Sequence, residues 1–212
     1  MRFEDRAEAG RALAQALRRA GSWSDPLVLG LTRGGVPVAH EVAVALGAEL
    51  DVAVARKIGA PGRPEFGVGA VTAGGEPIFD PATLRALGLT PRDLAVSCAA
   101  EQQEARRRLD AYRSGRAVRV AGRDVLVVDD GLATGVTARA ALREVRAAGP
   151  ARLVLAVPVG ATQSVRALRA EADLVVCPHE RHDFRSVGRF YRRFDQTTDA
   201  EVLTLLEQHH RE

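Results

Sequence analysis

Two adjacent carboxylates followed by a loop of small residues form the most distinctive chemistry in this sequence. Asp129 and Asp130 follow four apolar residues at 125–128, and a helix is expected to begin near Val136. A helix N-terminus presents free N–H groups and the positive end of the helix dipole, which together bind phosphate. Glycine lets the backbone approach phosphate oxygens closely. The intervening loop consists of Gly131, Leu132, Ala133, Thr134 and Gly135.

The two carboxylates must serve another part of the same ligand, because they would repel a phosphate. An ionised carboxylate only accepts hydrogen bonds, so the 2′,3′-diol of a ribose fits the pair. Thr134 and Thr137 add hydroxyl donors for the phosphate. This turn has neither the Gly-Lys-Ser/Thr of a nucleoside-triphosphate loop nor the Gly-x-Gly-x-x-Gly of a dinucleotide site. The turn therefore predicts a site for a phosphorylated pentose.

The segments around this turn alternate between short apolar runs and helical patterns. Strands are expected at 26–31, 50–56, 124–129, 152–159 and 173–177. Helices are expected at 34–47, 136–149, 163–172 and 199–209. This alternation predicts an α/β fold with a mainly parallel sheet covered by helices on both faces. Ligands bind beyond the carboxyl ends of such strands, where Asp129 and Asp130 lie.

The remaining segments are less regular. Asp5 and Glu8 resemble a capping pair before a helix whose Leu13 and Leu17 share one face. Residues 58–75 contain six glycines and two prolines, which predicts a loop with at most a short strand near 68–71. Another short strand is expected at 77–80. A charged helix is expected at 91–113, facing solvent or a second copy of the chain.

Composition bounds the class of protein. The chain has 212 residues, 46% of them apolar, and a formal net charge of +3. One domain is expected, with a core at about 24–178 and a hood and C-terminal helix at about 179–212. No dense basic run favours nucleic-acid binding. No apolar run approaches the ~20 residues that span a bilayer, and Cys98 and Cys177 have no metal-ligand spacing, so a soluble cytoplasmic protein is expected.

The stretch "VLVVDDGLATGVT" (125–137) closely resembles the phosphoribosyl-pyrophosphate (PRPP) motif of type I phosphoribosyltransferases. The alternative, an ordinary capped strand-turn-helix, leaves two adjacent charges unexplained. The resemblance implies that Asp129 and Asp130 hold the ribose hydroxyls. Ala133 stands where members acting on 6-oxopurines have an aspartate, so the chain looks more like the adenine or orotate branches. The residues implied for the 5′-phosphate are Gly131, Leu132, Ala133, Thr134, Gly135, Val136 and Thr137.

Two further stretches resemble the pyrophosphate-binding parts of that family. "GLTRGGVPVA" (30–39) is similar to its pyrophosphate loop, which often contains a cis non-proline peptide. "VARKIGAPGRPEFGVGAV" (54–71) is similar to its flexible catalytic loop, and Lys57 is the only lysine of the chain. The resemblance implies catalytic roles for Arg33, Lys57 and Glu65, although Glu65 could equally be a solvated loop carboxylate. The residues implied for pyrophosphate are Thr32, Arg33, Gly34, Gly35, Arg56 and Lys57.

The segment 179–194 carries four of the nine aromatic residues and corresponds to the family's hood, which receives the acceptor base. Aromatic faces could stack on a planar ring; alternatively, they hold the C-terminal segment against the core. The candidate acceptor contacts are His182, Asp183, Phe184 and Tyr191. His40 is expected to be structural, and His209 and His210 to belong to a solvated tail.

The resemblance implies transfer of a 5-phosphoribosyl group from PRPP to a nitrogenous acceptor, such as a nucleobase, with release of pyrophosphate. It also implies a homodimer. Mg²⁺ would be carried by PRPP oxygens and would meet Asp129 and Asp130 only indirectly, through ribose hydroxyls or water. The alternative is a non-catalytic protein on the same fold that senses PRPP or a nucleotide.

Overall fold

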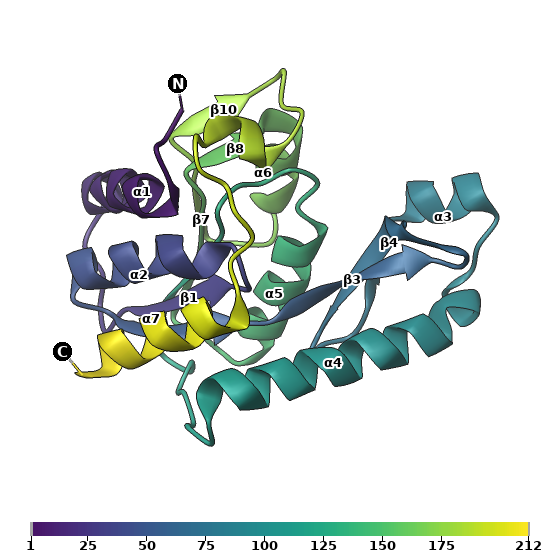
Figure 1. Cartoon of the computed structure of the whole chain (residues 1–212), viewed down its shortest axis with the longest axis horizontal. Helices are drawn as coiled ribbons and strands as arrows, with labels where there is room; N and C mark the ends of the chain where they lie inside the picture. The colour runs from purple at the N-terminus through teal and green to yellow at the C-terminus, as the bar shows by residue number, and fades with distance from the viewer. Residues whose placement is uncertain (1, 212) are drawn as a thin grey trace.

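A five-stranded parallel sheet forms the centre of the molecule, in the strand order β2-β1-β6-β7-β9 (Figure 1). The structure, a computed structural model, describes residues 2–211, apart from the side chains at positions 64 and 65. All neighbouring strands pair in parallel, which confirms the predicted sheet. The strands are β1 (Leu27–Leu31), β2 (Glu49–Ala53), β6 (Asp124–Val128), β7 (Arg152–Ala156) and β9 (Leu174–Val176).

Helices cover both faces of this sheet. One face packs against α1 (Arg6–Ala20), α2 (Gly35–Leu46) and α7 (Asp199–Arg211), and the other against α5 (Val136–Ala147) and α6 (Thr162–Leu168). Leu126 and Val128 belong to the first core, whereas Val125 and Val127 belong to the second. Because alternate residues of one strand enter two cores, the strands are apolar without interruption.

The first helix begins as its sequence predicts. Asp5 is the N-cap, and its carboxylate accepts a hydrogen bond from the Glu8 N–H at 3.0 Å. Leu13 and Leu17 are fully buried. None of the helices among residues 2–211 is long and apolar enough to cross a membrane.

Residues 55–113 form an arm that projects to one side of the sheet (Figure 1). It contains β3 (Ala55–Ala60), β4 (Arg63–Thr72), β5 (Ile78–Phe79), α3 (Pro81–Leu87), a 3-10 turn (Pro91–Leu94) and α4 (Ala95–Arg113). The predicted loop at 58–75 is therefore wrong, because most of it lies in an antiparallel hairpin. The strand expected at 50–56 is divided at Val54 between β2 and β3.

The arm has a small apolar core of its own, and this core explains why the glycine-rich sequence folds as strands. Ile58, Val68 and Leu94 are fully buried there. Gly62 adopts a φ of +71° in the turn between β3 and β4. A Cβ at Gly69 would lie 2.3 Å from the Ile78 carbonyl oxygen, so glycine lets β5 pack closely on β4. The helix predicted at 91–113 is confirmed over Ala95–Arg113; it buries Cys98, Ala105 and Tyr112 and leaves most of its other residues at the surface, as expected.

The hood consists of β8 (Val159–Ala161), β10 (His179–Arg181) and the loop 182–190, which ends in a 3-10 turn at Val187–Phe190. The apolar run expected as one strand at 152–159 therefore divides between β7 and the hood. A strap, residues 191–198, connects the hood to α7. The hood packs on the β6–α5 turn, where the Leu132 N–H donates to the Val159 carbonyl at 2.9 Å.

Candidate active site

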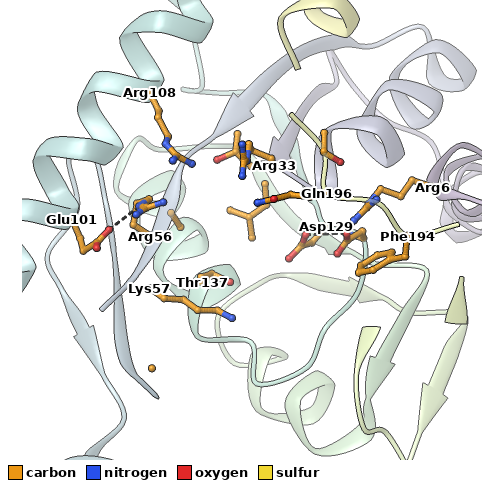
Figure 2. Close-up of a pocket in the computed structure, with 17 residues that line it drawn as sticks. Arg6, Arg33, Arg56, Lys57, Glu101, Arg108, Asp129, Thr137, Phe194 and Gln196 are labelled. Carbon is orange, nitrogen blue, oxygen red and sulfur yellow. Dashed lines mark hydrogen bonds and ion pairs between the residues drawn. The ribbon is translucent and has the colours of Figure 1, made fainter. Parts of the chain in front are cut away.

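A cavity of about 750 Å³ lies beyond the carboxyl ends of β1 and β6 (Figure 2). Its walls come from the β1–α2 turn, β3, α4, the β6–α5 turn, the strap and the first residue of α1. Candidate donor-site residues from three separate stretches line this one cavity, among them Arg33, Lys57 and Asp129. The sequence positions of these residues span almost a hundred residues, and the parallel sheet brings them together.

The two carboxylates occupy different environments. Asp129 is half-buried, and its Oδ1 accepts a hydrogen bond from the Asp130 N–H at 2.9 Å. Asp130 is buried, and its Oδ2 accepts from the Arg6 Nε at 2.8 Å. Burial, together with the negative charge of Asp130, raises the pKa of Asp129 well above its ordinary value. Asp129 is therefore the more accessible carboxylate of the pair, although both line the cavity.

The loop after the carboxylates presents a helix N-terminus. Gly135 is the N-cap of α5, adopts a φ of +76° and has no side-chain capping hydrogen bond. The first-turn N–H groups of a helix have no partner within it, so these donors are open to a ligand. Thr137 lines the main cavity, whereas Ala133 and Thr134 line an adjoining cavity of about 510 Å³. Gly67 of the arm borders both cavities, so they adjoin between the β6–α5 turn and the arm.

The β1–α2 turn packs directly against the carboxylates. The peptide bond between Thr32 and Arg33 is cis, as the resemblance to the pyrophosphate loop implied. A Cβ at Gly34 would lie 2.2 Å from the Asp130 Oδ2, and one at Gly35 would lie 2.5 Å from the Val128 carbonyl oxygen. Glycine is required at both positions because any side chain would displace the β6–α5 turn.

Five cations line the main cavity against three carboxylates. Arg33 lies 3.6 Å from Asp199, at the start of α7. Arg56 is paired with Glu101 at 2.7 Å. Among the described side chains Lys57 has no ion-pair partner, and its side chain is exposed (Figure 2). The excess of cations suits a highly charged anion such as a diphosphate. The cations are Arg6, Arg33, Arg56, Lys57 and Arg108, and the carboxylates are Glu101, Asp129 and Asp130.

Several lining residues carry no signal in the sequence. Glu101 and Arg108 belong to α4, which reads as a charged surface helix. Arg6, Gln196 and Thr197 come from opposite ends of the chain. Only the three-dimensional packing of α1, α4 and the strap places these residues beside the carboxylates. Glu65 lies in β4, but its side chain is outside the described part of the chain, so its proposed catalytic role stays a prediction.

The candidate acceptor residues lie apart from the cavity. His182 and Asp183 are exposed in the hood, where Asp183 pairs with Arg181 at 3.0 Å. Phe184 stacks on Phe190 with ring centroids 5.3 Å apart. Tyr191 is buried, and its hydroxyl donates to the Asp130 carbonyl at 2.6 Å.

Aromatic residues of the strap therefore hold it against the core. Phe194 stacks on Tyr191 at 5.0 Å and reaches the cavity wall. Val187 of the hood covers Gly131, where a Cβ would lie 2.6 Å from its Cγ1. Small size at Gly131 thus lets the hood contact the β6–α5 turn directly.

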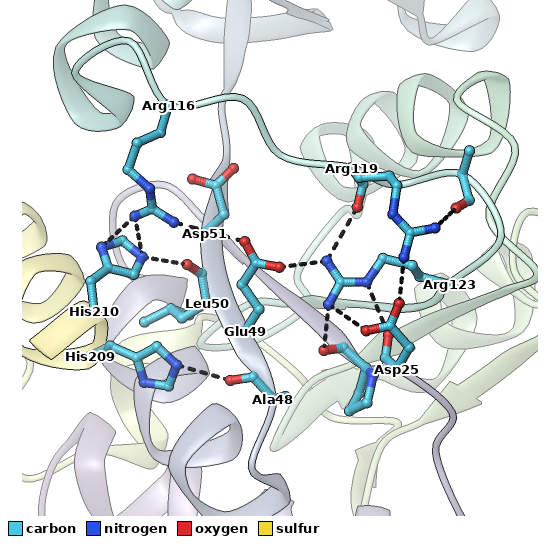
Figure 3. A network of polar contacts seen from close by, with 12 residues as sticks. Asp25, Ala48, Glu49, Leu50, Asp51, Arg116, Arg119, Arg123, His209 and His210 are labelled. Atoms are coloured by element: carbon cyan, nitrogen blue, oxygen red, sulfur yellow. Dashed lines mark hydrogen bonds and ion pairs between the residues drawn. The ribbon is translucent and has the colours of Figure 1, made fainter. Parts of the chain in front are cut away.

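A second polar network lies at the amino edge of the sheet (Figure 3). Arg123 is 6% exposed and donates to Glu49 at 2.5 Å. The predicted tail is wrong, because His209 and His210 lie in the last turn of α7 and contact the start of β2, although His210 remains exposed. The His209 Nε2–H donates to the Ala48 carbonyl at 2.9 Å, and the His210 Nε2–H to the Leu50 carbonyl at 3.1 Å.

The described residues offer no cluster of three or more His, Cys, Asp or Glu side chains that could hold a metal ion. At the cavity, the Asp130 Oδ2 accepts from Arg6, and Asp129 is the more accessible oxygen donor of the pair. Mg²⁺ prefers several oxygen ligands and retains water. These residues suit a Mg²⁺ ion that arrives with a phosphorylated ligand, and do not form a binding site by themselves.

Comparisons with known proteins agree with this geometry. The family model described as "Phosphoribosyl transferase domain" matches residues 3–190. The chain is 44% identical, over 99% of its length, to "Putative phosphoribosyl transferase Rv0571c" of Mycobacterium tuberculosis. It covers 47% of that relative, so the chain spans about half the length of the curated relatives it matches.

Two solved structures share the fold. The crystal structure of TT1426 from Thermus thermophilus superposes with a TM-score of 0.81, at 46% identity, covering 98% of this chain and 99% of that one. The AQ2163 protein from Aquifex aeolicus has a TM-score of 0.52 at 11% identity, covering 95% of this chain and 84% of that one. The second likeness concerns the fold alone.

Proposed function

The chain belongs to the phosphoribosyltransferase family, and from this premise we propose that it transfers the 5-phosphoribosyl group of PRPP to a nitrogenous acceptor and releases pyrophosphate. One observation carries the proposal. A carboxylate pair and a surplus of cations border one cavity, and residues at the uncapped N-terminus of α5 border an adjoining one. Each of these elements suits one part of PRPP.

In the proposed complex the ribose lies over Asp129 and Asp130, which accept hydrogen bonds from its hydroxyls. The 5′-phosphate binds the N-terminus of α5, with the hydroxyls of Thr134 and Thr137 beside it. The diphosphate lies toward Arg33 and Lys57. Arg56 and Arg108 complete this cationic wall, since both line the same cavity.

The chemistry proposed for these residues is mainly electrostatic. As the C1–O bond to pyrophosphate breaks, negative charge grows on the leaving group while C1 becomes oxocarbenium-like. Lys57 and Arg33 stabilise the developing charge, and both already line the cavity before the reaction. Asp129 and the phosphate loop hold the ribose in a fixed orientation toward the acceptor. The arm borders the cavity through Arg56, Lys57 and Gly67, so its inward movement would exclude water.

Mg²⁺ is proposed to enter with PRPP and, when bound, to neutralise part of the diphosphate charge. Asp129 would approach it through water or the ribose hydroxyls. The resemblance further predicts a homodimer, which light scattering after size-exclusion chromatography would measure.

The acceptor is proposed to enter along the strap. Once the residues proposed to bind PRPP are set apart, Phe194, Gln196 and Thr197 remain in the cavity wall with no role in PRPP binding. The Gln196 amide can both donate and accept hydrogen bonds, which suits the edge of a nucleobase. The hood residues His182, Asp183 and Phe184 lie outside this wall, and Tyr191 contributes by packing beneath it. Ala133 makes a 6-oxopurine the less favoured base.

Incubation with PRPP, Mg²⁺ and a panel of nucleobases and simple amines tests the proposal. Pyrophosphate and a matching ribonucleotide should form together, and Lys57→Ala should abolish most of this product. Arg63→Ala is the matched control, because Arg63 is an exposed cation of the same hairpin that does not line the cavity. PRPP binding with no pyrophosphate from any acceptor would favour the sensing protein instead.

A further inference from the structure

Arg6 makes three separate contacts beside the carboxylate pair. Its Nε donates to the Asp130 Oδ2 at 2.8 Å, and both side chains are only 13% exposed. Its NH1 donates to the Asp195 carbonyl at 2.8 Å. Its guanidinium carbon lies 4.0 Å from the centre of the Phe194 ring. Together these contacts hold the guanidinium in one orientation between the strap and the β6–α5 turn.

The surroundings of Asp130 would otherwise favour its neutral form. Burial raises the pKa of Asp130, and the Arg6 charge and hydrogen bond oppose that effect. Asp129 precedes it in the same turn, Gly34 packs on its carboxylate from the β1–α2 turn, and the Tyr191 hydroxyl meets its carbonyl from the strap. Lys57, across the cavity, acts on Asp129. Arg6 is therefore the cation in direct contact with Asp130.

A purely structural role for Arg6 would be to join α1 to the strap, but other contacts already do this. The Arg192 N–H donates to the Phe3 carbonyl at 2.9 Å, and the Arg193 N–H to the Glu4 carbonyl at 2.9 Å. The Arg193 side chain also pairs with Asp5 at 2.8 Å. What Arg6 adds to these contacts is its charge at the Asp130 carboxylate.

We propose that Arg6 is a positioning residue of the PRPP site, which keeps the Asp130 carboxylate ionised and correctly oriented so that the acid pair accepts the ribose hydroxyls. The inference rests on the proposed function, because PRPP is the ligand whose diol requires two acceptors. A protonated Asp130 would present a donor where the diol needs an acceptor. Without Arg6 the site would lose affinity most strongly in mildly acidic solution.

Calorimetry with PRPP and Mg²⁺ across mildly acidic to mildly alkaline pH tests this role. Arg6→Gln should weaken binding about tenfold or more at the acidic end, with recovery toward the alkaline end. Arg6→Lys should keep a profile close to that of the unmodified chain. Arg193→Gln, the control, removes a contact between the same two segments without touching Asp130, and should bind normally at every pH. A loss that is uniform with pH, or equal in Arg193→Gln, would overturn the inference.

A second measurement separates this inference from the proposed function. Carbon NMR of aspartate carboxyl groups in the ligand-free protein should show Asp130 titrating at higher pH in Arg6→Gln than in the unmodified chain. An unchanged titration would overturn the role of Arg6 even if PRPP binds. If Asp130 titrates at higher pH in Arg6→Gln but the protein does not bind PRPP, the proposed function is contradicted. The control of Asp130 by Arg6 is then still supported.

Discussion

The two edges of the central sheet use the same residue types for opposite purposes. At the amino edge, Arg123 donates to Glu49 and to the carbonyls of Asp25 and Pro26. The Asp124 carboxylate accepts from the Ser24 N–H at 2.9 Å. At the carboxyl edge, Lys57 has no ion-pair partner among the described side chains, and Asp129 has a raised pKa. The amino edge satisfies its charges internally, whereas the carboxyl edge, where Arg6 and Arg56 are also paired, leaves Lys57 and Asp129 for a ligand.

The difference follows from the geometry of a parallel sheet. Loops at the carboxyl ends lead into helices whose N-termini attract anions, so charges there gain from binding a ligand. Charges at the amino edge meet strand starts, where nearby carbonyls accept hydrogen bonds from arginine. Polar groups that await a ligand commonly reduce stability, and the paired network at the other edge offsets that cost.

The largest expected effect comes from Lys57→Ala. Removing the unpaired cation should lower kcat on the order of 10²–10³-fold, as does loss of one group that stabilises transition-state charge. The free energy of unfolding should change little, because the side chain is exposed. Steady-state kinetics and urea unfolding measure the two quantities. If Lys57→Ala kept normal turnover but lost stability, this carboxyl-edge residue would have a structural role, which would contradict the distinction between the two edges.

Arg123→Ala should have the converse profile. Its side chain is 7% exposed and bonds to three backbone carbonyls, so truncation leaves buried acceptors unpaired. Glu49 and Asp25 are partly exposed and regain water, so we expect a loss of about 2–3 kcal/mol, below the usual range for a broken buried pair. Urea unfolding measures the loss, while kcat measured well below the melting temperature should stay unchanged. A tenfold fall in kcat in the folded variant would contradict this assignment.

Asp129→Asn should increase stability in a pH-dependent manner. Because the folded-state pKa of Asp129 is raised, the folded protein holds this proton to higher pH than the unfolded chain does. Well below the ordinary carboxyl pKa of about 4, both states are protonated and the group contributes nothing. As the pH rises from the ordinary pKa to the folded-state pKa, only the unfolded chain gives up this proton, so stability falls until both states are ionised. Urea unfolding should therefore show a higher free energy of unfolding for Asp129→Asn than for the unmodified chain at neutral pH. This difference should vanish toward acidic pH. An advantage independent of pH would exclude this cause.

The smallest effect is expected from Arg119→Ala. Arg119 belongs to the same network as Arg123, but its side chain is 67% exposed and its partner Asp25 is 52% exposed. Such pairs contribute about 1 kcal/mol or less. Urea unfolding beside Arg123→Ala would show whether burial, not membership of the network, decides the contribution. Equal losses in both variants would contradict that conclusion.

Local sequence predicted the parts of the site that are continuous in the chain. The acid pair and its loop lie within thirteen residues, so strand, turn and helix follow from short-range pattern. The same holds for the β1–α2 turn. These segments are recognisable because backbone chemistry, such as close approach at Gly34 and Gly35, demands particular residues there.

The rest depends on contacts between distant segments. Glycines at 59, 62, 67 and 69 favour a loop locally, but packing of Ile58, Val68 and Leu94 stabilises a hairpin. Arg6 and Gln196 reach the cavity only because α1 and the strap pack side by side at its rim. The role of the aromatic residues at 184–194 could not be predicted, because the local sequence does not show whether a ring such as Tyr191 stacks on a ligand or is buried beneath Asp130.

Calorimetric titration of PRPP with Mg²⁺ into the unmodified chain and into Asp129→Asn tests the central claim most directly. The account predicts one site per chain, with affinity reduced about 10–100-fold in the variant because a charged hydrogen-bond acceptor is lost. Absence of binding heat in the unmodified chain, or equal affinity in the two proteins, would contradict the assignment of this cavity to the phosphoribosyl donor.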